Sequence, residues 1–171
     1  MKHFRLALVL SLLPACAMAA DQLGSITATV DGAEHTWFLT AEGGESQSNA
    51  TPVMNGLTSV QLWGHATADS ATSVKGALLI DFSLITLGGT PTVADATLQY
   101  LVDGYKGGYL ATDDDSVQIT VTTAEPQDKA LHITGSFTAT AAYSDQPMLQ
   151  LTDDSRQMQI AGHFDARLPQ E

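Results

Sequence analysis

Hydrophobic and polar residues alternate one by one along much of this chain. Residues 25–30 read SITATV and residues 117–122 read VQITVT, so every second side chain is apolar in both runs. Successive side chains of a β-strand point to opposite faces of its sheet, and this alternation is therefore typical of half-buried strands. No stretch after residue 20 carries a sustained apolar repeat of about 3.6 residues, so the pattern predicts an all-β chain.

The breaks between the alternating runs indicate how the strands are connected. Asp31-Gly32 separates two such runs and predicts a tight hairpin turn. Residues 42–55 are polar and contain Pro52, which predicts a long loop. Residues 75–85, KGALLIDFSLI, are apolar on both faces and predict a central strand that is covered on both sides.

About eight such strands follow one another between residue 21 and residue 171. Their regular spacing is typical of an all-β sandwich. We therefore expect residues 21–171 to form one domain, a single antiparallel β-sandwich or a barrel-like sandwich. Residues 103–109, DGYKGGY, are expected to form a hairpin tip within it.

Two strands near the C-terminus repeat one face and not the other. Residues 131–140 read LHITGSFTAT and residues 158–167 read MQIAGHFDAR. Identity at every second residue is identity of one face of a strand, so we expect the matching residues to be buried. The matching pairs are Ile133 and Ile160, Gly135 and Gly162, Phe137 and Phe164, and Ala139 and Ala166.

Two arrangements explain this repeat. If the strands pair as an antiparallel hairpin, with Gly135 near Phe164 and Phe137 near Gly162, each phenylalanine covers the bare backbone of the other strand's glycine. Alternatively, the two strands hold equivalent places in two sheets, as after an ancient duplication. The sequence leaves both arrangements open.

The first twenty residues, MKHFRLALVLSLLPACAMAA, have a basic start, an apolar run and small residues at the end. This composition predicts a secretory signal, whose apolar run is too short to span a bilayer. We expect residues 1–20 to be removed before Asp21, which gives a periplasmic or secreted protein without a transmembrane segment. Residues 13–16, LPAC, also resemble the bacterial lipoprotein box, which would anchor the chain through a lipid on Cys16.

The mature chain is strongly acidic. The full sequence has a net charge of −12, and loss of the two positive charges of Lys2 and Arg5 takes it to −14. Such a charge disfavours binding to nucleic acid or to an anionic membrane surface, and it suits solubility, Ca²⁺ or a cationic partner. Cys16 is the only cysteine, so a chain that begins at Asp21 contains no disulfide.

Four short segments carry a resemblance to known proteins. The chain opens with Ala-Thr-Val-Asp-Gly at 28–32 and Thr-Trp-Phe at 36–38. It closes on Gly-Ser-Phe-Thr-Ala at 135–139 and Gly-His-Phe-Asp-Ala-Arg-Leu at 162–168. Through these segments it resembles several families of small bacterial envelope proteins of unknown function, and the likeness covers about a third of the chain, at its two ends. The resemblance implies an all-β exported domain and transfers no catalytic residue.

Carboxylates are concentrated at Asp113, Asp114 and Asp115, with a further pair at Asp153 and Asp154. Clustered carboxylates repel one another, and Ca²⁺, which prefers several oxygen ligands, relieves that repulsion. Neither run has the spacing of an EF-hand loop. We consider Asp113, Asp114 and Asp115 a candidate Ca²⁺ site, with a solvated acidic loop as the alternative.

Catalytic signatures are missing from the sequence. It contains no Gly-x-Ser-x-Gly motif, and its histidines after residue 20 lack the close spacing of a metal site, so we expect them on the surface or in loops. These histidines are His35, His65, His132 and His163. Asp81 interrupts an apolar strand, but alternation places it on the face opposite the core, where pairing or solvent accounts for it. We assign no catalytic residue.

Aromatic residues provide the remaining candidate contacts. Tyr105 and Tyr109 flank the tip at residues 106–108, and rings held on a loop can stack on a sugar or anchor a protein partner. Simple packing is the alternative role for both tyrosines. Trp37 and Trp63 lie within predicted strands and are expected in the core.

Taken together, these features predict a non-enzymatic exported binding or interaction module of the bacterial cell envelope. Its partner would be an envelope protein or a glycan, contacted through residues 42–55 and 105–109. A Ca²⁺-stabilised domain of the carbohydrate-binding kind is the second hypothesis, and a small secreted hydrolase is the third.

Overall fold

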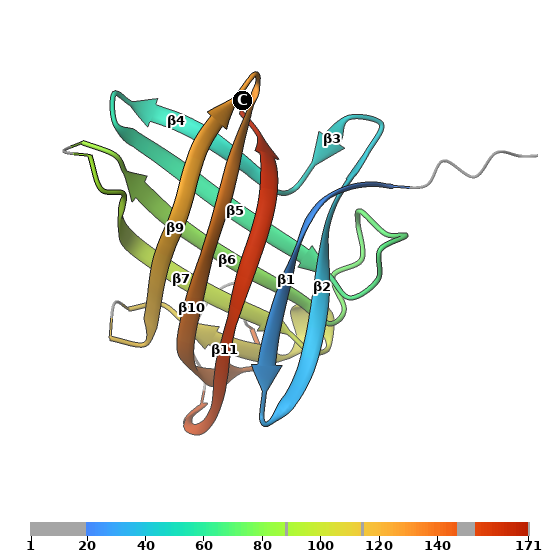
Figure 1. Cartoon of the computed structure of the whole chain (residues 1–171). Coiled ribbons are helices and arrows are strands. Elements are labelled where there is room, and N and C mark those ends of the chain that lie inside the picture. The colour runs from blue at the N-terminus through green and yellow to red at the C-terminus, as the bar shows by residue number, and fades with distance from the viewer. Residues whose placement is uncertain (1–19, 88, 114, 147–152, 171) are drawn as a thin grey trace, which may run out of the picture.

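The computed structural model describes residues 20–87, 89–113, 115–146 and 153–170 (Figure 1). Neighbouring strands of this part of the chain pair antiparallel, which confirms the predicted all-β fold. Within it, no helix is both long enough and apolar enough to cross a membrane. The elements are β1 (Asp21–Val30), β2 (Ala33–Glu42), β3 (Glu45–Ser46), β4 (Asn49–Met54), β5 (Leu57–His65), β6 (Ala77–Ile85), β7 (Thr92–Leu101), the short 3-10 helix η1 (Gly104–Lys106), β8 (Gly108–Ala111), β9 (Val117–Gln127), β10 (Ala130–Ser144) and β11 (Asp153–Pro169).

Two layers of strands cross one another, and the core lies between them (Figure 1). The front layer runs β9–β10–β11–β1–β2, and the back layer runs β8–β7–β6–β5–β4. The layers join where β10 pairs with β8 and where β2 pairs with β5. These pairings close a ring of eight of the described strands, in agreement with the predicted barrel-like sandwich, and leave β3, β4 and β9 outside the ring.

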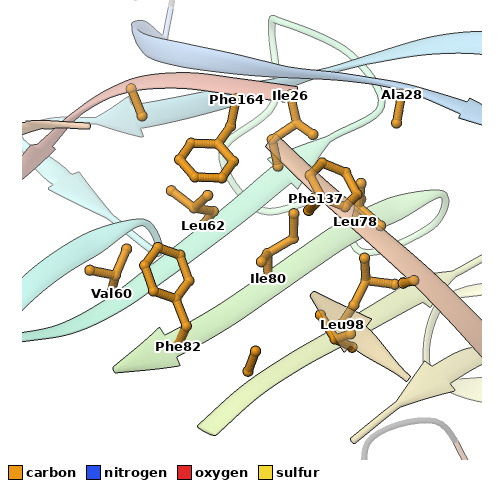
Figure 2. Packing of buried hydrophobic residues seen from close by; sticks show 14 of the residues in the cluster. Ile26, Ala28, Val60, Leu62, Leu78, Ile80, Phe82, Leu98, Phe137 and Phe164 are labelled. Carbon is orange, nitrogen blue, oxygen red and sulfur yellow. The ribbon is translucent and has the colours of Figure 1, made fainter. Parts of the chain in front are cut away.

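The core is built from the inward faces of both layers (Figure 2). Ile26 and Phe164 project from the front layer toward Leu62 and Ile80 of the back layer. Phe164 also meets Phe82, with ring centroids 6.2 Å apart. Because a strand buries every second residue, the apolar face that alternation predicts is the face that packs against the opposite layer.

Of the two arrangements that the sequence left open, the repeated strands form the antiparallel hairpin. In the register of β10 and β11, Gly135 lies opposite Phe164 and Phe137 lies opposite Gly162. Both phenylalanines belong to the main core, so the two strands are neighbours in one sheet. A Cβ atom at Gly135 would lie 2.6 Å from Cζ of Phe164, so the ring covers this glycine, and 2.5 Å from the carbonyl oxygen of Thr120, so β9 also approaches it closely.

Gly162 has a different neighbour. The atoms nearest to a Cβ at this position are the carbonyl oxygen of Thr27 and the Cα and Cβ atoms of Ala28. Gly162 therefore accommodates the close approach of β1, which pairs with β11 through Ala28 and Gly162. Glycine is required here because of a third strand, β1, which is not part of the β10–β11 hairpin.

Two predicted hairpins are confirmed. Asp31 and Gly32, with φ values of 47° and 83°, join β1 to β2 in a tight two-residue turn. The tip at residues 103–109 contains η1 and the start of β8, and it joins the paired strands β7 and β8.

The prediction of a long loop over residues 42–55 is wrong. Most of this segment forms β3 and β4, and β4 pairs with β5 at the edge of the back layer. Pro52 is compatible with a strand at that place because an edge strand leaves one side of its backbone unpaired. Ser48 extends the pairing, since its Oγ accepts a hydrogen bond from the backbone N–H of Trp63 at 2.8 Å.

A second, smaller apolar cluster covers the outer face of the back layer. Trp63, Ala77, Leu79 and Leu101 pack there with Val74 from the loop that follows β5. Residues 77–80 are buried on both faces of β6, which confirms the prediction of a strand covered on both sides. Trp37, in contrast, belongs to the main core between the layers.

Candidate functional site

The long strand β10 changes its partner along its length, and a groove lies where it does so. It pairs with β9 from Ala130 to Ala139 and with β8 from Ala142 to Ser144. The chain between β8 and β9, residues 112–116, crosses this change of partner. Because β8 and β9 both end here, the edge of β10 that faces away from β11 has no described strand paired with it at residues 140 and 141.

Hydrogen bonds hold the crossing segment in place. The backbone N–H of Ser116 donates to Asp113 Oδ1 at 2.7 Å, and the Ser116 hydroxyl donates to the Asp113 carbonyl oxygen at 2.9 Å. The N–H of Thr140 donates to the Ser116 carbonyl oxygen at 2.8 Å, which attaches the segment to β10. An aspartate that accepts from a backbone N–H a few residues later is a common way to fix a turn.

Two adjoining hollows of about 370 Å³ and about 200 Å³ lie along this segment. Both are lined by Asp115, Ser116 and Thr140, so they lie next to each other, and we call the two together the seam groove. Its other polar lining residues are Thr112, Asp113, Gln118, Thr138, Gln157 and Gln159. The groove therefore presents carboxylates, hydroxyls and amides, with Leu110 and Ala142 as apolar floor.

The amide and hydroxyl groups of the groove are partly oriented by one another. Gln159 Nε2 donates to Thr140 Oγ1 at 2.9 Å across β10 and β11. A glutamine amide supplies both donors and an acceptor, and a hydroxyl does the same, so this pair can bind either kind of polar group. Sequence reasoning missed these residues because polar residues on the outer face of a strand are common, and only the tertiary seam brings them together.

Two of the three aspartates of the candidate Ca²⁺ site line the seam groove. Asp113 and Asp115 share the larger hollow, whereas Asp114 lies outside the described residues. One oxygen of Asp113 already accepts from Ser116. Among the described residues, no three acidic, histidine or cysteine side chains converge as a metal-binding group. The Ca²⁺ site stays a prediction.

Tyr105 and Tyr109 have different environments. Tyr105 lies in η1 and is 54% exposed. Tyr109 lies in β8, is half-buried against the main core, and meets Tyr143 edge to face at 5.7 Å. Arg156 lies over the other ring, with its guanidinium carbon 3.8 Å from the centroid of Tyr143. Tyr105 is thus placed to contact a partner, and Tyr109 is placed to pack, while a binding role for either stays a prediction.

A further hollow of about 390 Å³ lies beside β3, in the region from which sequence reasoning expected binding. Glu42, Glu45, Ser46 and Gln47 line it together with Ala71 and Thr72 of the loop after β5. It is a single depression at the end of a layer. The seam groove comprises two adjacent hollows and includes predicted site residues, so it is the better candidate.

His65 corrects the expectation that all four histidines lie on the surface or in loops. It is 1% exposed at the end of β5, and its Nδ1 lies 2.8 Å from the carbonyl oxygen of Ser73. A carbonyl only accepts, so Nδ1 donates this hydrogen bond. His65 Nε2 is buried with no partner in the described chain. Residues 66–76 fold back over the strand end, a tertiary contact that alternation does not report.

The other histidines that were placed by alternation occupy the outer face of the front layer, as predicted. His163 lies opposite Ser136. His132 Nε2 lies 2.9 Å from Asp165 Oδ1, on the exposed side of the sheet. Exposed pairs of this kind contribute little to stability. Among the residues that the structure describes, neither histidine belongs to a group of three side chains that could hold a metal ion.

Asp81 lies on the outer face of β6, as predicted, between Gln61 of β5 and Thr97 of β7. Burial raises the pKa of its carboxyl from 3.8 to about 6, although a hydrogen bond with Gln61 acts in the opposite direction. A raised pKa can mark a general acid. The two flanking residues in this row are an amide and a hydroxyl, so they provide no second ionisable group for such a reaction.

Comparison with protein-family models, with curated proteins and with solved structures finds no match for this chain. The seam groove is therefore interpreted from its own residues and geometry.

Proposed function

We propose that this chain is an exported, non-enzymatic binding module of the bacterial cell envelope, and that it binds a hydroxyl-rich ligand such as a glycan in the seam groove. The observation that carries the proposal is that two adjacent hollows share Asp115, Ser116 and Thr140 as lining residues. Export is proposed from the signal-like composition of residues 1–20.

The chemistry of the lining favours a neutral, hydroxyl-rich ligand. Carboxylates accept hydrogen bonds from sugar hydroxyls, and glutamine amides both donate and accept. The net charge of −12 opposes an anionic ligand. The two carboxylates of the groove belong to one short turn, whereas glycoside hydrolysis requires two carboxyl groups on opposite sides of the scissile bond. This arrangement supports binding over turnover.

Calorimetry with soluble oligosaccharides tests the proposal. We expect at least one of maltotriose, cellotriose and chitotriose to bind, and Thr140→Val and Gln159→Leu each to weaken that binding about fivefold, since each removes a hydrogen bond worth about 1 kcal/mol. Thr27→Val is the matched control, because Thr27 faces outward from β1 in the same layer and does not line the groove. Equal binding by all three variants would contradict the proposal, as would failure of all three sugars to bind.

A second candidate is a Ca²⁺-stabilised carbohydrate-binding domain. It is favoured by the position of Asp113 and Asp115 in one hollow. If Ca²⁺ binds the folded chain there, millimolar Ca²⁺ raises the unfolding midpoint and Mg²⁺ does not. Asp115→Asn should abolish that rise. A midpoint that responds equally to both cations reports charge screening and removes this candidate.

A further inference from the structure

The outer edge of β9 has no strand beside it. Within the described part of the chain, β9 pairs with β10 along one side and with no other strand. A hollow of about 410 Å³, lined by residues of β7 and β9, lies between this edge and the neighbouring strand of the back layer. Among the described residues, this edge therefore has no paired strand beyond Val117, whose own side chain is buried.

The direction of the backbone groups on this edge follows from two hydrogen bonds. The N–H of Thr140 donates to the carbonyl oxygen of Ser116, so Ser116 directs its carbonyl toward β10. The N–H of Val117 donates instead to Asp113, away from β10. In an antiparallel pair these directions alternate residue by residue, and the register is regular from Val117 to Val121. Ile119 and Val121 therefore direct both N–H and C=O outward.

The first eight residues of this edge lack the charges and prolines that usually protect a strand from pairing with another chain, although a bulge follows Val121. Residues 117–124, VQITVTTA, contain no charged side chain and no proline, although the whole chain has 19 acidic residues. Edge strands are ordinarily short, charged or interrupted by proline. The other strands outside the ring fit that rule, because β3 has two residues and β4 contains Pro52, whereas in β9 Glu125 and Pro126 lie only near the end of the strand.

Charge and residue order both indicate a second copy of this chain as the occupant. Two strongly acidic molecules can approach most closely where neither carries a charge, and residues 117–124 are such a segment. The order Ile119-Thr120-Val121 is also self-complementary. When two copies run antiparallel with Thr120 opposite Thr120, each Ile119 meets the Val121 of the other copy, and β-branched residues and threonine pairs suit such contacts.

We propose that two copies of this chain pair edge to edge through β9, antiparallel across a two-fold axis centred on Thr120. The outward N–H and C=O groups of Ile119 and Val121 then bond to the same groups of the second copy. The front layers of the two molecules become one continuous sheet, and the half-buried side chains of Ile119 and Val121 are covered. This surface adjoins the seam groove, because Gln118 lines both the groove and the hollow at the edge of β9.

Light scattering of the purified protein, without oligosaccharide, tests the proposal between about 1 µM and about 500 µM, the range of weak and moderate association. The mass should rise from one chain to two. Thr120→Glu and Thr120→Lys should each weaken dimerisation about fivefold, because each places like charges opposite one another. An equimolar mixture of the two variants should dimerise more strongly than either alone, since it pairs Glu with Lys.

Thr27→Glu is the matched control and should dimerise as the unchanged protein does, because β1 is paired on both sides. Hydrogen exchange gives a second readout: the amides of Ile119 and Val121 should exchange more slowly at high concentration, whereas those of Gln118 and Thr120 should already be slow. A mass of one chain at every concentration would overturn the proposal. A dimer that both Thr120 variants leave unchanged would overturn it as well.

Discussion

Replacement of Asp81 by asparagine is expected to stabilise this protein at neutral pH. The carboxyl lies on the outer face of β6 between Gln61 and Thr97, where burial raises its pKa from 3.8 to about 6. The proton of the Asp81 carboxyl is therefore bound more tightly in the folded chain than in the unfolded chain. Ionisation of Asp81 therefore costs stability, and the cost begins above pH 3.8 and is complete above about pH 6.

The magnitude follows from the two pKa values. A tenfold change in the acid constant corresponds to about 1.4 kcal/mol, so a rise from 3.8 to about 6 corresponds to about 3 kcal/mol. Asp81 is partly accessible to water, which lowers this figure, and we expect a gain of about 2 kcal/mol for Asp81→Asn at neutral pH. Asparagine keeps a side-chain oxygen for the hydrogen bond with Gln61 and carries no charge.

Urea unfolding followed by tryptophan fluorescence measures this gain, because both Trp37 and Trp63 are buried in the folded chain. The variant and the unchanged protein should be equally stable near pH 4 and diverge as the pH rises to about 7. Asp31→Asn is the matched control. It removes one negative charge from the exposed β1–β2 turn, and asparagine tolerates the backbone conformation of Asp31. If both variants give the same pH profile, the effect is one of net charge, and the reasoning about Asp81 burial is refuted.

Three further substitutions test the packing and the crossing segment by urea unfolding. Phe164→Ala should cost about 3–5 kcal/mol, because the ring is 1% exposed at the centre of the core, and a loss below about 1 kcal/mol would contradict its packing role. Gly135→Ala should cost about 1–3 kcal/mol, since the added Cβ would meet the Thr120 carbonyl oxygen at 2.5 Å and Phe164 Cζ at 2.6 Å, and Phe164→Leu in the same chain should recover only the part of that loss that comes from the ring. Asp113→Ala should cost about 1 kcal/mol through loss of its 2.7 Å hydrogen bond to Ser116, and a neutral result would show that the turn does not depend on it.

The alternation of apolar and polar side chains predicted the structural features that depend on a single strand and its immediate partner. It identified the all-β class and the buried face of the repeat, and it offered the pairing of Gly135 with Phe164 as one of two arrangements. A period of two reports which face is apolar, and an apolar face in water must be covered. It also placed Asp81 and His163 on outer faces, because their neighbours in the chain are core residues.

The features that were missed depend on contacts between distant segments. The polar residues 42–55 form an edge strand because β5 lies beside them, and composition alone cannot distinguish an edge from a loop. His65 is buried because residues 66–76 return over it, and Gly162 is required because β1 approaches it. The seam groove exists because β10 leaves β9 and joins β8, and only two of its residues, Asp113 and Asp115, stood out in the sequence.

The most direct test of the proposed function is a titration of isotope-labelled protein with the oligosaccharide that binds, followed by NMR. We expect the largest changes at the amides of Asp115, Ser116, Thr140 and Gln159, which lie along the seam groove. Saturable changes confined to these residues and their neighbours would support a ligand in the groove. Saturable changes centred instead on Tyr105 of η1, or on the hollow beside β3, would place the ligand elsewhere and contradict the account.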